Sequence, residues 1–440
     1  MNAAKSANVA VIGAGWAGMA AAVELADRGI ATTVLEAART LGGRARRVEM
    51  DGTALDNGQH ILIGAYTETL AQMQRVGADP HKLLQRMPLQ LRYAGGFALA
   101  APRWPAPLHL AAALLGAKGL SLAQRFAAIA FMQALKRAQF RVEPDSTVAA
   151  LLQRHGQHGA LVEFLWEPLC VSALNTPAAH ASAQVFASVL RDSLAGKREN
   201  SDLLLPRIDL TALFPEPAAA FVTARGGRIL SGDAVKRIGY ETGGGAAPWR
   251  LDDRPQRFSH VVLATGPHHA SALLGDLPGL APTRALIDAL EYQPIYTCYL
   301  QYPAGVALPS PMLGFGGGVI QWAFDRGTLS GMPGLIAAVV SASGQHQGLT
   351  QEAFGAAVDS ELRTHLGGSL PAPLWQRVIA EKRATFACAP NLARPAHETA
   401  LPGLLLAGDY TASPYPATLE SAVRSGIACA RSIAAGTGAA

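Results

Sequence analysis

Apolar and polar positions near the start of the chain follow first a strand pattern and then a helical one. Asn8 to Ile12 is a mostly apolar run that predicts a buried parallel strand. Trp16 to Arg28 has apolar residues at helical spacing and is closed by Gly29. Ala31 to Leu35 is a second, β-branched strand that ends in Glu36. This order predicts an α/β fold with a Rossmann-like domain and a parallel sheet.

Patterns further along the chain predict a second domain inserted in the first. Phe126 to Leu135 has helical spacing, and so do Val185, Phe186, Val189 and Leu190. Strand patterns cover Tyr296 to Gln301, Met312 to Phe324, Leu335 to Ser343 and Val378 to Phe386. We expect an α+β domain with a mixed, mostly antiparallel sheet, capped by helices from roughly Lys82 to Leu194.

The expected domain boundaries follow from these patterns and from the prolines that interrupt them. The first domain is expected to comprise residues 1–81, 218–294 and 387–440. The inserted, substrate-binding domain is expected to comprise residues 82–217 and 295–386.

The turn after the first strand carries a glycine fingerprint, Gly13-Ala14-Gly15-Trp16-Ala17-Gly18. Gly13 permits the tight turn, Gly15 lets backbone N–H groups approach a pyrophosphate, and Gly18 lets helix and strand pack closely. Glu36 can accept hydrogen bonds from both ribose hydroxyls of an adenosine. A 2′-phosphate would meet this carboxylate, so the unit predicts a dinucleotide site and disfavours NADP.

Other segments favour FAD over NAD. Leu41-Gly42-Gly43-Arg44 can wrap a second loop around the pyrophosphate, with a guanidinium on a phosphate oxygen; a solvated basic turn is the alternative. The strand Leu404 to Leu406 leads into Gly408-Asp409, which would aim Asp409 at a ribityl or phosphate group. The helix after Ala417-Thr418-Leu419 would place its N-terminal end at the pyrimidine edge of a flavin.

Together, GAGWAG, LGGRARR, DNGQH and AGDYT…ATLESAVRSG resemble the flavin amine oxidase and phytoene desaturase superfamily from end to end. The resemblance implies a glutathione-reductase-type FAD-binding domain with FAD extended between the first and last segments. HVVLATG resembles the internal strand and turn of that fold, and Gly232 to Val235 the segment that holds the adenine. The implied cofactor-binding residues are Gly13, Gly15, Trp16, Ala17, Gly18, Glu36, Ala37, Gly42, Gly43, Arg44, Gly58, Gln59, His60, Val235, Thr265, Gly266, Gly408, Asp409, Ala417, Thr418 and Leu419.

A narrower resemblance concerns the substrate. WEPLC, ALNTP, LLLPRIDL and DNGQHILIGAYTETL resemble the squalene-associated FAD-dependent desaturase group, whose characterised activity is hydroxysqualene dehydroxylation in squalene and hopanoid biosynthesis. This resemblance implies a long-chain isoprenoid substrate near Trp166, Leu169, Asn175 and Tyr415. A carotenoid desaturase or isomerase, a flavin amine oxidase, and a non-catalytic flavin- or lipid-binding protein are the alternatives. Thr418 stands where amine oxidases carry an aromatic cage residue, which disfavours a flavin amine oxidase.

Catalysis on an allylic alcohol requires a proton donor, because hydroxide is a poor leaving group. His60 follows the flavin loop and is the candidate catalytic residue; packing or hydrogen bonding to the flavin ring is its alternative role. The sequence contains no second GxGxxG, so we expect an electron donor outside this chain. No metal site is expected, because the four cysteines are far apart and form no CxxC pair.

Composition narrows the partners and the location. Half of the chain is hydrophobic and 16% is charged, which excludes a disordered chain. The net charge of +5 comes without a Lys/Arg block, so nucleic acid is disfavoured, while attraction to anionic lipid headgroups remains. The uncharged stretch from Trp104 to Ala117 is too short to span a bilayer. We therefore expect a cytoplasmic protein that contacts the inner face of the cytoplasmic membrane peripherally.

Overall fold

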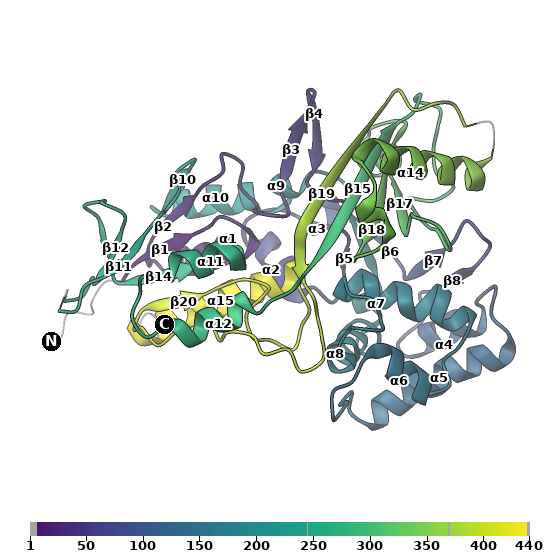
Figure 1. Ribbon diagram of the computed structural model, residues 1–440, viewed down its shortest axis with the longest axis horizontal. Helices are drawn as coiled ribbons and strands as arrows, with labels where there is room; N and C mark the ends of the chain where they lie inside the picture. Colours follow the sequence, from purple (N-terminus) through teal and green to yellow (C-terminus); the bar gives the residue numbers. More distant parts are fainter. Residues whose placement is uncertain (1–6, 244, 368–369, 438–440) are drawn as a thin grey trace.

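The computed structural model describes residues 7–243, 245–367 and 370–437. Figure 1 shows two groups of elements side by side: a parallel sheet with its helices on the left, and an antiparallel sheet with a helical cluster on the right. This arrangement confirms the expected α/β fold with an additional α+β part.

The parallel sheet has five strands in the order β10-β2-β1-β14-β20. Its strands are β1 (Asn8–Ile12), β2 (Ala31–Glu36), β10 (Arg228–Ser231), β14 (His260–Leu263) and β20 (Leu404–Leu406). All neighbouring pairs are parallel. Because β2 lies on one side of β1 and β14 on the other, the direction of winding reverses at β1.

Alternate residues of the parallel sheet pack into two cores. Val9 and Val11 face α1 (Trp16–Asp27), α10 (Pro215–Ala224) and α15 (Leu419–Thr437). Ala10 and Ile12 face the opposite side. That side carries β11 (Ile238–Tyr240), β12 (Trp249–Leu251), β13 (Arg257–Phe258), α11 (Pro267–Leu273) and α12 (Ala281–Asp288). The parallel sheet is therefore the buried middle layer, as its apolar strands predict.

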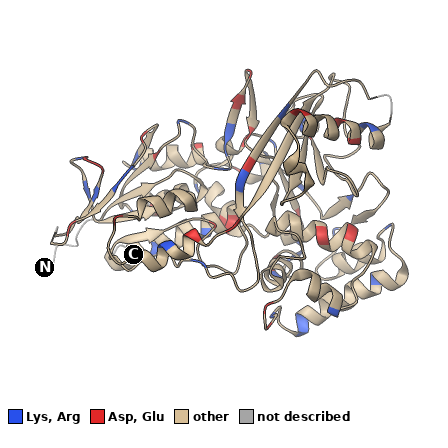
Figure 2. Cartoon of the chain, in the orientation of Figure 1, with Lys and Arg blue, Asp and Glu red and all other residues tan. Residues whose placement is uncertain are grey.

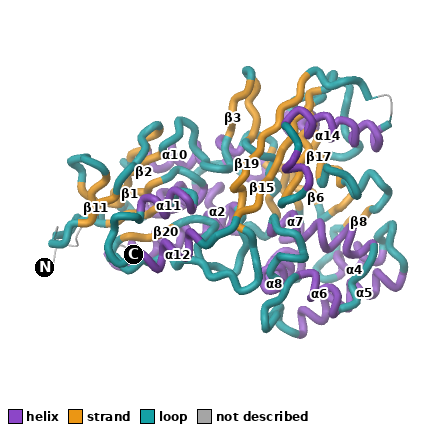
Figure 3. The backbone as a smooth tube through the Cα atoms, in the orientation of Figure 1, coloured by secondary structure: helices purple, strands orange, loops and turns teal. Residues whose placement is uncertain are grey.

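The second large sheet is antiparallel throughout, in the order β16-β17-β18-β15-β19. Its strands are β15 (Tyr292–Gln301), β16 (Met312–Gly314), β17 (Trp322–Asp325), β18 (Leu335–Ser341) and β19 (Trp375–Phe386). The expected single strand from Met312 to Phe324 is wrong: the chain reverses through Gly316-Gly317-Gly318, with Gly317 at φ +78°, and forms the hairpin β16–β17. Figure 3 shows the long strands β15 and β19 running between the two groups of elements.

The antiparallel sheet is covered on both faces. One face packs against α14 (Gln351–Leu366) through Phe354, Val358 and Leu362. The other face lies toward a cluster formed by α4 (Leu108–Leu115), α5 (Leu122–Arg137), α6 (Val148–Arg154), a π-helical turn (Val162–Trp166), α7 (Glu167–Leu174) and α8 (Ala183–Leu194). The expected capping helices are thus present, although residues 84–100 of that range form short strands.

Small elements connect the two groups. The strands are β3 (Arg47–Met50), β4 (Thr53–Asp56), β5 (Leu62–Ile63), β6 (Leu84–Met87), β7 (Gln90–Arg92), β8 (Ala98–Ala100) and β9 (Leu203–Pro206). The helices are α2 (Thr67–Arg75), α3 (Pro80–Leu83), α9 (Leu210–Leu213) and α13 (Arg326–Ser330). Strands β5, β9 and β6 form one sheet that joins residues assigned to different domains, so the exact domain boundaries stay a prediction. Within the described residues, none of the helices has the length and apolar character needed to cross a membrane.

Candidate functional site

The turns that follow β1 and β14 lie against each other at the carboxyl edge of the parallel sheet. Gly13 has φ +103°, and a Cβ built on it would lie 2.7 Å from the carbonyl oxygen of Ala264. A Cβ on Gly18 would lie 1.9 Å from the carbonyl oxygen of Gly13. The close approach therefore requires glycine at both positions, and it brings the predicted residues Thr265 and Gly266 next to the fingerprint.

Two glycine loops form a cradle at the N-terminus of α1. The Gly42 N–H donates to the carbonyl oxygen of Ala14 at 2.9 Å, which holds the second loop against the first. A Cβ on Gly15 would meet only the Cα of Gly43, at 3.8 Å, among atoms within 4 Å. Gly15 is the N-cap of α1 and supplies no side-chain hydrogen bond. This leaves room and N–H donors for a phosphate group at the cradle.

Trp16 and Ala17 belong to the cradle only through their backbone. The Trp16 indole is buried, donates from Nε1 to the carbonyl oxygen of Ala45 at 3.1 Å and packs against Phe214. Its side chain is therefore part of the core behind the helix. A contact between Trp16 and the cofactor therefore stays a prediction, and it concerns the backbone N–H of Trp16.

Glu36 lies at the end of β2, beside the segment predicted to hold an adenine. Its carboxylate accepts from the N–H groups of Ala14 at 2.7 Å and Ala38 at 2.8 Å. The Asp233 N–H donates to the carbonyl oxygen of Glu36 at 2.9 Å, which brings the loop with Val235 to this strand end. Both carboxylate oxygens keep a further lone pair, so they can still accept from ribose hydroxyls.

Arg44 and Asp409 are 365 residues apart in sequence and form an ion pair, with Nη2 to Oδ1 at 2.6 Å. The second guanidinium nitrogen, Nη1, donates to the carbonyl oxygen of Ala384 in β19 at 2.5 Å. Burial lowers the pKa of Arg44, but Asp409, Glu381 and Tyr292 together raise it more. Arg44 therefore remains charged, and it joins the glycine cradle to the Gly408-Asp409 turn and to the antiparallel sheet.

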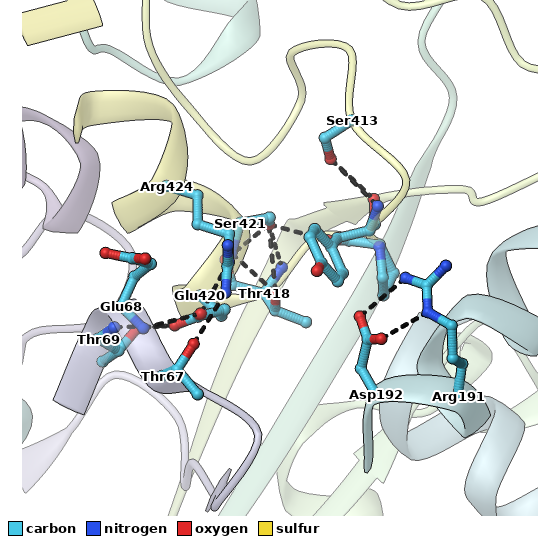
Figure 4. Close-up of polar contacts among 12 residues, drawn as sticks. Thr67, Glu68, Thr69, Arg191, Asp192, Ser413, Thr418, Glu420, Ser421 and Arg424 are labelled. Carbon is cyan, nitrogen blue, oxygen red and sulfur yellow. Dashed lines mark hydrogen bonds and ion pairs between the residues drawn. The ribbon is translucent and has the colours of Figure 1, made fainter. Parts of the chain in front are cut away.

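The N-terminal end of α15 is held by Glu420, as Figure 4 shows. Its buried carboxylate accepts from the N–H groups of Glu68 at 3.0 Å and Thr69 at 2.9 Å, and from the hydroxyl of Thr69 at 2.7 Å. Arg424 donates to it from the next turn of α15 at 2.8 Å. Glu420 thus caps α2 from another helix and fixes the direction of α15. The predicted residues Ala417, Thr418 and Leu419 lie at this fixed end.

The DNGQH segment after β4 is tied to the antiparallel sheet. Asp56 is buried; it accepts from the Leu210 N–H at 2.8 Å and lies 3.7 Å from Arg326 Nη1. Arg326 also donates to the Gln59 side chain at 2.9 Å. Burial raises the pKa of Asp56 from 3.8 to about 6, although Arg326 opposes this shift. His60 Nδ1 lies 2.7 Å from the carbonyl oxygen of Gly58.

The residues at this edge fit a flavin dinucleotide. The cradle offers a phosphate site, Glu36 a ribose site, and Arg44 a cation next to both loops. Two buried hydroxyls, Thr265 Oγ1 and Tyr410 OH, have no hydrogen-bond partner among the described residues. Buried hydroxyls are normally satisfied, so these two are consistent with a polar group in the same place.

The four predicted substrate residues lie in different places. Trp166 and Leu169 line an apolar cavity of about 520 Å³ between α4, α5, α7 and β7–β8. Asn175 lies outside it: its amide donates to Thr385 Oγ1 at 2.9 Å and accepts from the Ala342 N–H at 2.7 Å, so it braces the antiparallel sheet. Tyr415 lies on the loop before α15, where its N–H donates to Ser413 and its ring faces Arg424.

Sequence reasoning missed Arg326, Arg394 and Glu420. Arg326 contacts Asp56 and Gln59, and Arg394 donates to the carbonyl oxygens of Asp409 and Ser413. Neither arginine is part of a recognised motif, and their partners become neighbours only in the folded chain. Glu420 lies within the recognised ATLESAVRSG run, where an acid in the first helical turn was the available signal.

Comparisons with known proteins agree with this geometry. Residues 16–434 match the model of a family described as flavin containing amine oxidoreductase. A hydroxysqualene dehydroxylase of Rhodopseudomonas palustris is 30% identical over 96% of this chain and 97% of its own length. A hydroxysqualene dehydroxylase of Sinorhizobium fredii is 27% identical over 95% and 96%. The crystal structure of an oxidoreductase from Methanosarcina mazei matches with a TM-score of 0.73 at 17% identity, covering 96% of this chain and 99% of that one.

Proposed function

The chain belongs to the family of flavin-containing amine oxidoreductases, and from its similarity to hydroxysqualene dehydroxylases we propose that it reduces hydroxysqualene to squalene. It is an FAD-dependent oxidoreductase. The proposed reaction replaces the allylic hydroxyl of hydroxysqualene by hydrogen and releases water, at the expense of two electrons and two protons. An electron donor outside this chain supplies the electrons.

One observation carries the proposal: the match to hydroxysqualene dehydroxylases runs from end to end. The matched region includes the helical cluster and the antiparallel sheet. Enzymes that share an FAD-binding domain differ mainly in such a substrate-binding part, so a match there is informative about the substrate. The apolar cavity beside Trp166 and Leu169 supports an isoprenoid, because its lining is almost entirely aliphatic and aromatic.

FAD supplies the hydride when it is bound in its reduced form. The chain would hold it through the Gly15–Gly43 cradle, Glu36 and the N-terminal end of α15. The chain must also keep water away from the carbon that loses its hydroxyl, because water would recapture the allylic cation. Asp56 and Gln59 of the DNGQH segment are buried and contact Arg326, which would give this part of the site fixed walls.

We propose His60 as the proton donor to the departing hydroxyl. The carbonyl oxygen of Gly58 can only accept, so His60 Nδ1 carries a hydrogen and Nε2 is the nitrogen that exchanges a proton. Burial lowers the pKa of His60, with a further lowering by Arg44, while the Gly58 contact raises it. The donor form is the imidazolium, so we expect kcat to fall as pH rises through this lowered pKa. His60→Asn should abolish that pH dependence; a pH profile unchanged by the substitution would exclude His60 as the donor.

The function is tested by anaerobic incubation of the purified holoenzyme with hydroxysqualene and a chemical reductant of the flavin. We expect squalene, identified by mass spectrometry, in an amount that follows the reductant added. Enzyme without reductant is the control and should give none. Absence of squalene, combined with oxidation of a carotene, would favour the desaturase alternative instead.

We further propose that the protein works at a membrane surface. The basic and apolar residues around Phe126 to Leu135 support this contact.

A further inference from the structure

Large exposed apolar side chains are concentrated on one part of the molecule. Seven such side chains are found among the described residues, and five of them lie between residues 104 and 126, with 43% to 67% of their surface exposed: Trp104, Leu108, Leu115, Leu122 and Phe126. On α5, Leu122, Phe126 and Ala130 are exposed at intervals of four residues, so they share one helix face. We call these five side chains with α4 and α5 the docking face; it lies at the lower right of Figure 1.

Hydrogen bonds connect the two helices of the docking face to each other and to β8. Ser121 and Gln124 form a capping box at the start of α5. Arg125 donates to the carbonyl oxygens of Leu115 at 2.5 Å and Leu120 at 3.1 Å, which fastens the end of α4 to α5. Lys118 pairs with Ala98 of β8 through its backbone. The apolar side chains are therefore presented by a well-braced helical hairpin.

The segment that contains the docking face is exclusively basic. Residues 80–142 hold nine Lys and Arg residues and no Asp or Glu: Lys82, Arg86, Arg92, Arg103, Lys118, Arg125, Lys136, Arg137 and Arg141. The whole chain carries 37 basic and 32 acidic residues, so the remainder carries 28 and 32 and is net negative. Figure 2 shows blue positions along α5. Arg125, Lys136 and Arg137 lie on α5, and Arg103 and Lys118 lie next to α4 in the sequence, whereas Arg86 is paired with Asp202 and Lys82 lies 3.9 Å from Asp79. The docking face therefore carries basic residues and no acidic residue of its own.

The apolar cavity is lined in part by the same two helices. Its lining includes Leu110 and Leu114 of α4 and Ile129 and Met132 of α5, together with Trp166. Lys136 and Arg137, which are exposed, also border it. An apolar chamber with a basic border therefore lies directly behind the docking face.

We propose that the docking face binds the surface of a bilayer that contains anionic phospholipid, and that the isoprenoid passes between the bilayer and the cavity at this contact. The exposed apolar side chains enter the headgroup–acyl boundary, and the basic residues contact the headgroups. A second copy of the chain is a poor occupant, because two copies of this face would bring like charges together. The passage of an isoprenoid rests on the proposed function; the binding to lipid does not.

Lipid binding is tested by co-sedimentation of the holoenzyme with vesicles of phosphatidylcholine, with and without phosphatidylglycerol. We expect binding to the anionic vesicles and a loss of affinity of about tenfold or more in Leu122→Ser/Phe126→Ser. Leu374→Ser is the matched control, because Leu374 is 69% exposed and lies outside the docking face. Lys118→Gln with Arg103→Gln should reduce the preference for anionic vesicles. Equal binding by the double serine variant and the wild type, or a wild-type dimer that this variant abolishes, would overturn the proposal.

The passage of substrate is tested with hydroxysqualene presented either in anionic vesicles or in detergent micelles. Leu122→Ser/Phe126→Ser should lose at least about tenfold in rate with vesicles and keep the wild-type rate with micelles. Equal loss in both would refute the passage. If the wild type converts the substrate in neither form but still sediments with anionic vesicles, the proposed function fails and the docking face stands.

Discussion

Asp56 combines deep burial with an acidic side chain that has only two close polar partners. Its carboxylate accepts one backbone N–H, from Leu210, and lies 3.7 Å from Arg326. The Tyr299 hydroxyl, 3.0 Å away, donates to the backbone carbonyl of Asp56 and not to its side chain. Desolvation therefore outweighs attraction to Arg326 and raises the pKa to about 6.

The raised pKa of Asp56 predicts a pH-dependent stability. The folded protein binds the Asp56 proton more tightly than the unfolded chain does. The resulting contribution to the free energy of unfolding is fully present below pH 3.8 and is lost as pH rises through about 6. The loss amounts to at most about 3 kcal/mol of unfolding free energy. Asp56→Asn stays neutral and should gain stability relative to the wild type between pH 4.5 and 7, measured by denaturant unfolding.

Asp253→Asn is the control for the removal of an acid, because the Asp253 side chain is 90% exposed. Its stability relative to the wild type should change little over the same pH range. If the free energies of unfolding of Asp56→Asn and the wild type differ by the same amount at every pH, the pKa of Asp56 is not raised by folding.

The Asp56 site also marks what the sequence allows at the scale of residues. Asp56 and Gln59 are recognisable because they stand in one short motif. Arg326 lies 267 positions from Gln59 and follows a strand of another sheet, so only the tertiary fold reveals it as their partner. In the same way, Trp16 stands inside the fingerprint, but its large ring is more favourably buried against Phe214 than exposed to a cofactor.

At the scale of elements, α1 and α15 cross where Gly426 removes all side-chain bulk. A Cβ on Gly426 would lie 2.0 Å from the carbonyl oxygen of Ala17 and 2.9 Å from the Ala21 nitrogen. These are backbone atoms of a buried helix, so they cannot move aside. The two helices that carry the cradle and the Ala417–Leu419 end are thus positioned by one glycine.

Gly426→Ala should therefore push α15 away from α1. We expect a destabilisation of about 1–3 kcal/mol, as overpacking in a core usually gives, together with a weaker retention of FAD. Gly436→Ala is the matched control on the same helix, because nothing lies within 4 Å of its Cβ and alanine favours helix. Thermal unfolding and the flavin absorbance of the purified variants measure both effects; equal behaviour of the two variants would contradict the crossing.

Elements with a clear hydrophobic pattern could be predicted from the sequence, whereas short strands bounded by turns were predicted less well. Strand β1 has the expected bounds because its continuous apolar run is buried on both faces of the sheet. Helix α5 contains the expected range Phe126 to Leu135 but begins at Leu122 and ends at Arg137. The hairpin β16–β17 was missed because both strands are short and apolar, and the three glycines between them are the only local signal. Strand β6 pairs with the distant β9, which a local pattern does not contain, and β7 and β8 form a local hairpin whose strands of three residues are too short to show a period.

At the scale of the whole molecule, FAD contacts would come from both ends of the chain. Gly15 follows β1, Asp409 follows β20, and both strands belong to one sheet. Binding to the folded state alone stabilises a protein by about 2.7 kcal/mol when the ligand stands at 100 times its Kd. We expect FAD to raise the Tm of the apoprotein accordingly.

Gly15→Leu should abolish this rise without unfolding the apoprotein, because a Cβ at Gly15 enters open space in the cradle. Gly348→Leu, which also has open space but lies in another part of the chain, should respond to FAD like the wild type. Thermal unfolding with increasing FAD distinguishes the two. A normal response of Gly15→Leu would place the pyrophosphate elsewhere.

The pairing of β14 with β20 has a consequence for biosynthesis. A ribosome releases β1 and β2 well before Leu404–Leu406 and α15 emerge, and it releases β19, the last strand of the antiparallel sheet, shortly before them. Until then the central layer lacks its edge strand, Arg44 lacks Asp409, and α1 exposes the surface that later contacts Gly426. A nascent chain therefore acquires its prosthetic group only after β20 and α15 have left the ribosome, and a truncation before residue 404 leaves a colourless product that chaperones must handle.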